Sequence, residues 1–209
     1  QMNPTYRRMI LENEAAPVSQ LSSAFLAPAS PLHLQFAYYE SAVVVEYLID
    51  NYGVDTIKKL LNDLADGSTI NQALVAHVAP LGQLDGEFAE YLNARAEALA
   101  PGLTWESLDL PPTATTEELT AWLVDHPNNF NALRRLARAH LENDAYAEAL
   151  APAKRLRERF PNYVGDDNAY ELLAAAHRGL DDAASEREVL AALAERSADA
   201  VDAYFRLME

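Results

Sequence analysis

The stretch Leu136-Ala137-Arg138-Ala139-His140 decides the fold, because it returns 37 residues later as Leu173-Ala174-Ala175-Ala176-His177. A shorter echo carries Ala169-Tyr170 to Ala203-Tyr204, with an offset of 34 residues. A period in this range is typical of helical hairpins that stack one on the next. The third copy reaches the last residue, Glu209, after about one helix. We therefore expect this sequence to be a piece of a longer protein.

The composition also favours helices. Half of the 209 residues are hydrophobic, yet only 9% are aromatic, because Ala and Leu make up much of the apolar total. Such a mixture suits close-packed helices better than a sheet sandwich, and no period-2 alternation indicates a strand. With no cysteine, disulfides and thiolate metal sites are excluded. The sequence predicts an all-α protein.

Proline and glycine pairs divide the chain into parts. Pro101-Gly102 and Pro111-Pro112 bracket an irregular linker over residues 101–114, in which Trp105 is the expected anchor. Before the linker, residues 1–100 should form a helical subdomain, and after it residues 115–209 should form a short helical-hairpin solenoid whose last repeat is truncated. The apolar spacing predicts five helices ahead of the repeats, over residues 36–51, 55–66, 69–78, 84–99 and 116–125.

Acidic residues outnumber basic ones throughout, and the formal net charge is −16. Residues 1–100 hold 5 Lys/Arg and 12 Asp/Glu, and residues 101–209 hold 11 and 20. Such a surface repels the phosphates of nucleic acid and of anionic membranes. No run of about 18 apolar residues is present, so no membrane insertion is predicted. The expected partners are proteins or peptides.

The repeats can be matched to a family position by position. Small residues are needed where two helices cross closely, and a proline is tolerated just after a helix. The pattern resembles the tetratricopeptide repeat at seven signature positions, which are Leu133, Leu136, Ala137, His140, Tyr146, Ala149 and Pro161. The second repeat departs from that pattern, because Glu186 stands where the second helix usually has Ala. His140 and His177 share one slot between helices, which indicates packing within the hairpin and not metal binding.

This resemblance implies a concave groove that holds peptide segments. The matching positions form the predicted peptide-binding set, which consists of Asn131, Arg134, Arg138, Asn168 and Glu171. Arg134 and Arg138 lie one turn apart on one face, so they could grip a carboxylate. The alternative is that both arginines pair with Glu142, with Glu171 or with solvent.

The run Phe36-Ala37-Tyr38-Tyr39-Glu40-Ser41-Ala42 is followed by Tyr47-Leu48 and Tyr52-Gly53. It resembles the helix after the active site of gluzincin (peptidase MA-like) metallopeptidases. In the aminopeptidase members, the matching tyrosine donates a hydrogen bond to the carbonyl oxygen as the tetrahedral intermediate forms. The resemblance assigns that role to Tyr39, in the parent protein only. The alternative is that Tyr38 and Tyr39 pack at the start of a core helix.

The motif that would bind zinc is missing. Zinc hydrolases need His-Glu-x-x-His, and none of the five histidines here is followed by Glu. We therefore expect no cofactor, no metal ligand and no enzyme activity in this chain, and zinc in the parent only if the motif lies upstream.

The sequence thus predicts a non-catalytic scaffold that binds protein or peptide, taken from a zinc metallopeptidase-like protein. The alternative is a pure interaction or assembly module whose peptidase-like half is degenerate. The residues themselves assign no cell compartment, and only the resemblance points to a bacterial protein that is exported or periplasmic.

Overall fold

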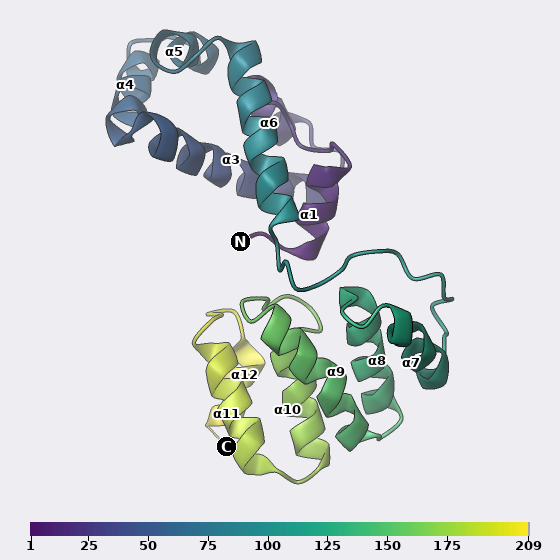
Figure 1. Ribbon diagram of the computed structural model, residues 1–209. Coiled ribbons are helices and arrows are strands. Elements are labelled where there is room, and N and C mark those ends of the chain that lie inside the picture. The colour runs from purple at the N-terminus through teal and green to yellow at the C-terminus, as the bar shows by residue number, and fades with distance from the viewer. Residues whose placement is uncertain (209) are drawn as a thin grey trace. The chain divides into compact units, whose positions relative to one another are not determined.

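The computed structural model describes residues 1–208, which are all-α and contain no strand (Figure 1). The chain divides into two compact units, one of Gln1–Leu99 and one that begins at Ala100. The all-α prediction is therefore confirmed. The N-terminal unit contains α1 (Pro4–Leu11), the 3₁₀ helix η1 (Val18–Gln20), α2 (Leu21–Leu26), α3 (Pro31–Tyr52), α4 (Val54–Ala65), α5 (Ile70–His77) and α6 (Leu81–Glu97).

Helix α3 is the longest helix of the N-terminal unit, and it begins five residues before the predicted start at residue 36. Ser30 caps it by accepting a hydrogen bond from the His33 N–H, and Pro31 occupies the first helical position. Proline is favoured there, because its missing N–H would have no partner in the first turn. The helix ends at Gly53, whose φ of +80° is left-handed and turns the chain directly into α4.

The core of the N-terminal unit forms around α3. Phe36, Val43 and Leu48 of this helix pack with Met9 of α1 and Phe88 of α6, and all five side chains are buried. Aromatic contacts reinforce the packing of α3 on α6, since the Tyr47 and Phe88 ring centroids lie 5.6 Å apart in an edge-to-face arrangement.

The second unit contains α7 (Thr116–Asp125), α8 (Phe130–Glu142), α9 (Tyr146–Arg159), α10 (Ala169–Gly179), α11 (Ala183–Ala194) and α12 (Val201–Leu207). Each helix packs against the next, so that α8 to α11 form consecutive antiparallel hairpins in a solenoid-like row (Figure 1). The helices approach closely because Ala137, Ala149 and Ala174 are buried at their crossings. Gly179 serves the same end, because the Tyr146 ring lies where its Cβ would be.

The segment predicted as a linker packs on the second unit. The Trp105 ring lies 5.1 Å from that of Phe130, and Leu103 is buried. The Thr104 N–H donates to the Asn128 carbonyl at 2.9 Å, and the Phe130 N–H donates back to the Thr104 carbonyl at 3.0 Å. These contacts make residues 103–105 part of the packing of the second unit.

Candidate functional site

Tyr39 lies on α3 in an aromatic cluster. Its ring stacks on Tyr6 of α1 at 4.9 Å, and its hydroxyl donates to Met2 Sδ at 3.6 Å. The Tyr39 side chain is partly buried, and this burial raises the pKa of Tyr39 to about 12. The nearby guanidinium of Arg95 opposes the shift. The phenol is therefore neutral at physiological pH and can act as a hydrogen-bond donor.

Glu40 follows Tyr39 and is buried, with 1% of its surface exposed. The Ala16 N–H donates to the carboxyl group, and Oε1 has no hydrogen-bond partner. Burial raises the pKa of Glu40 to about 7, since desolvation penalises the charged form more than the Ala16 hydrogen bond favours it. Sequence reasoning missed this residue, although an acid within a run of core residues was the available signal.

An apolar cavity of about 280 Å³ opens between α2, α3, α4 and α5. Its walls are almost entirely aliphatic and include Val44, Leu48, Leu60 and Leu74. Leu61 of α4 lines it while 60% of its surface is exposed. Part of the apolar stripe of α4 therefore lines a cavity that can accept apolar side chains, and does not only pack in the core.

The arginines of the predicted peptide-binding set are held by their own chain. Arg138 of α8 donates from Nε to Glu142 at 3.1 Å and from Nη1 to Asp167 at 2.8 Å. Arg134 donates from Nη1 to the Asp166 carbonyl at 3.4 Å, and its guanidinium lies over the Phe130 ring at 5.4 Å. Arg138 thus makes one of the ion pairs that the alternative interpretation named, the one with Glu142.

The other members of that set differ in exposure. Asn168 is buried and caps α10, because its Oδ1 accepts from the N–H groups of Tyr170 and Glu171. The cap of α8 is Asn129, so the two caps are 39 residues apart and Asn131 lies inside the helix, where it is half-buried. The 37-residue offset had matched Asn131 with Asn168, yet only Asn168 is a cap. The Asn168 side-chain amide is thus used within its own chain, since its Nδ2 also donates to the Gly165 carbonyl at 3.0 Å.

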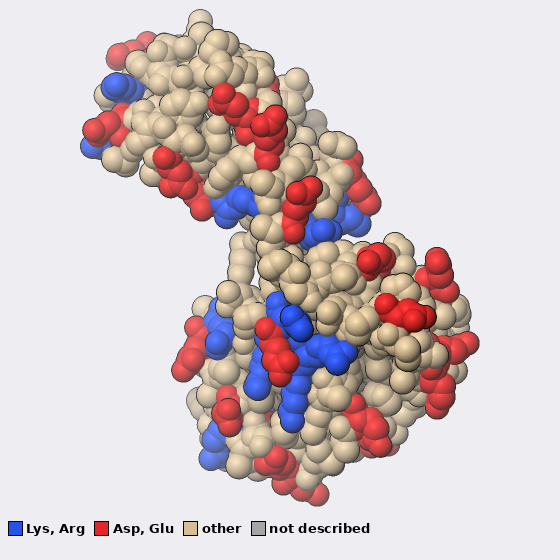
Figure 2. Space-filling model, viewed as in Figure 1, with Lys and Arg blue, Asp and Glu red and all other residues tan. Residues whose placement is uncertain are grey.

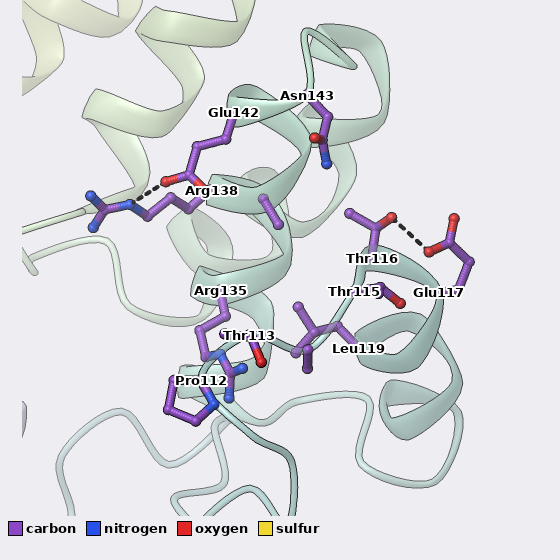
Figure 3. A pocket seen from close by; sticks show the side chains of 12 residues that line it. Pro112, Thr113, Thr115, Thr116, Glu117, Leu119, Arg135, Arg138, Glu142 and Asn143 are labelled. Carbon is purple, nitrogen blue, oxygen red and sulfur yellow. Dashed lines mark hydrogen bonds and ion pairs between the residues drawn. The ribbon is translucent and has the colours of Figure 1, made fainter.

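Two cavities flank the α8–α10 row. Glu171 and Arg178 line one of about 360 Å³, an open cavity bordered by α10, α11 and α12. The other, of about 620 Å³, lies between α7 and α8 and is lined by Arg135, Arg138 and Glu142 together with threonine hydroxyls (Figure 3). Both combine acidic and basic side chains over a partly apolar floor, so each is suited to polar contacts with an extended ligand.

The contacts of Glu186 explain why this position departs from the repeat pattern. Its carboxylate accepts from Arg178 Nε at 2.8 Å and from Arg206 Nη1 at 2.9 Å. One acidic side chain of α11 therefore links α10 and α12 by hydrogen bonds that an alanine at this position could not form.

Within residues 1–208, no group of three His, Cys, Asp or Glu side chains is arranged to hold a metal ion. No helix of the described part of the chain is long and apolar enough to cross a membrane.

Comparison with known proteins gave a match to a family model. The family model described as the Peptidase MA superfamily matches residues 5–94, which include α3 and Tyr39. No curated protein and no solved structure matches the chain. The N-terminal unit is therefore similar to the peptidase-like domain of the Peptidase MA superfamily.

Proposed function

We propose that this chain is a scaffold that binds protein or peptide segments on its second unit and that carries a peptidase-like helical unit without activity of its own. The observation that carries the proposal is the row of hairpins from α8 to α11, with cavities of about 360 and 620 Å³ beside α10 and α8. The tetratricopeptide resemblance of these hairpins supports a peptide groove on the face formed by α8 and α10.

The charges on this face suit polar recognition. Arg138 and Glu171 are both exposed, and each lines one of the two cavities. A carboxylate of the ligand could replace Asp167 or Glu142 on Arg138 at little cost, because exposed ion pairs contribute only about 0–1 kcal/mol. We therefore propose that Arg134 and Arg138 bind oxygen atoms of their own chain in the free protein and exchange them for oxygen atoms of the ligand.

A peptide-library screen with the full chain tests the proposal. Arg134→Ala combined with Arg138→Ala should remove the hits that carry a carboxylate, and Glu171→Ala should remove hits that carry a basic residue. Arg187→Ala on α11, which changes an exposed arginine outside both cavities, is the matched control and should leave the hits unchanged. A library with no hits, or hits that none of the groove variants alters, would reject this function.

As a second candidate, we propose that the N-terminal unit forms one wall of a zinc peptidase cleft in the parent protein, with Tyr39 as a hydrogen-bond donor. The match to the Peptidase MA superfamily supports it, as does the neutral phenol of Tyr39. The described residues supply no metal-ligand group, so the ligands would have to come from outside this sequence.

Zinc content measured on the parent protein separates this candidate from the degenerate assembly module. About one zinc per chain, with a lower kcat in Tyr39→Phe, would support the peptidase. A folded parent protein without zinc would support the assembly module. Zinc-dependent activity that Tyr39→Phe does not change would reject the role of Tyr39.

A further inference from the structure

The last turns of α9 carry four basic side chains, Lys154, Arg155, Arg157 and Arg159, which we call the basic end of α9. These are four of the 16 Lys and Arg residues of a chain that has 32 Asp and Glu. Figure 2 shows basic side chains gathered over α9 on this face of the second unit, with an acidic one among them. Glu158 is the one acid in this stretch of α9, and it is exposed.

Several other arginines of this unit form ion pairs with carboxylates. Arg178 and Arg206 share Glu186, and Arg138 pairs with Glu142 and Asp167. In the basic end of α9, by contrast, none of the four cations forms an ion pair with a carboxylate of the described residues. Arg155 donates to the Pro127 carbonyl at 2.8 Å.

The helix dipole accounts for only part of this clustering. Cations near a helix C-terminus interact favourably with the free carbonyl groups, but the effect falls off within the last turn. Arg157 and Arg159 lie in that turn, whereas Lys154 and Arg155 precede it. In a chain with two acids for each base, four adjacent cations without a carboxylate partner are a local excess of positive charge that an external anion would neutralise.

We propose that the basic end of α9 is a docking surface for an acidic segment of a partner protein, one with several Asp or Glu residues close together. Carboxylates match the guanidinium groups in pairs of hydrogen bonds. Nucleic acid fits less well. An extended polyphosphate would reach beyond the basic end of α9 and would be repelled by the rest of the surface, because the chain has a net charge of −16. This surface belongs to α9 and not to the face formed by α8 and α10, so the inference does not depend on the proposed peptide groove.

Fluorescence anisotropy with the full chain and a labelled peptide of eight Glu residues spaced by Gly and Ser tests this directly. Lys154→Gln combined with Arg157→Gln should weaken binding about fivefold at low salt, since two exposed ion pairs are lost. Glu158→Gln should tighten binding, because it removes the one acidic charge within the basic end of α9. Raising the salt concentration to about 150 mM should weaken binding of the unaltered chain.

Lys58→Gln combined with Lys59→Gln on α4 is the control, because it changes the net charge equally at a site in the other unit. If this control weakens binding as much as the α9 pair, or if the peptide does not bind, the docking surface is rejected. Binding of single-stranded DNA or of anionic vesicles without binding of the peptide would also reject it. Should the double variant fail to fold, Lys154→Gln alone, which changes an exposed side chain without a polar contact, gives the same comparison.

Discussion

At the scale of single residues, Glu40 has the environment least suited to its charge. Its carboxyl group is buried, one oxygen lacks a partner, and its pKa is raised to about 7 from 4.5. The folded state therefore holds its proton more tightly than the unfolded state does. Stability from this group is complete below about pH 4.5 and is lost as the pH rises through 7, by up to about 3 kcal/mol.

Glu40→Gln should remove this pH dependence, because an amide does not ionise. We expect the variant to be more stable than the original chain by about 1–3 kcal/mol at pH 8 and nearly equal to it at pH 5. Urea unfolding at both pH values measures the difference. Glu90→Gln, an exposed acid on α6, is the control and should show no such change. A Glu40→Gln variant that is equally destabilised at both pH values would contradict the raised pKa.

At Gly179 a steric constraint, and not a charge, determines which residue is tolerated. A Cβ at this position would lie 2.3 Å from the Tyr146 ring, whereas a Cβ at Gly86 in α6 would meet nothing within 4 Å. Gly179→Ala should therefore destabilise the second unit by about 1–3 kcal/mol through overpacking. Gly86→Ala should stabilise the N-terminal unit by about 0.5–1 kcal/mol, because alanine restricts the unfolded chain and favours the helix. Thermal unfolding followed by circular dichroism tests both variants. The two changes in stability must have opposite signs, and changes of the same sign would contradict the prediction.

At the scale of elements, Glu186 of α11 links α12 to α10, in addition to the packing of α12 on α11. Glu186→Ala would restore the small residue of the repeat pattern, yet it leaves Arg178 and Arg206 without their shared carboxylate. We expect α12 to lose roughly 1 kcal/mol of local stability, a modest value because both arginines are partly exposed. Hydrogen exchange should show faster exchange in α12 and no change in α8. Glu188→Ala, an exposed neighbour on α11, should leave both helices unchanged.

The elements also show what sequence can and cannot predict. The repeated alanines predicted the hairpins, because close helix crossings tolerate only small residues. The start of α3 was missed because Pro31 reads as a breaker, and only the Ser30 cap makes it the first helical residue. The role of Asn168 was missed because α10 begins later in its repeat than α8 does, a shift of two residues that the 37-residue offset conceals. The cavity beside Leu61 was missed because an apolar stripe has the same spacing whether it is buried or open.

At the scale of the whole molecule, the boundary at Leu99–Ala100 has a consequence for how the chain can be divided. Each unit contains its own buried apolar residues, so residues 1–99 and residues 100–209 should each fold alone. A piece that begins at residue 115 would instead lose Leu103 and the Trp105 ring from the surface of Phe130. We expect it to be less stable than residues 100–209 by roughly 2–5 kcal/mol, the range for deleting a buried leucine such as Leu103. Urea unfolding of the two pieces compares them directly, and equal stability would mean that residues 103–105 only connect the units and do not belong to the core of the second.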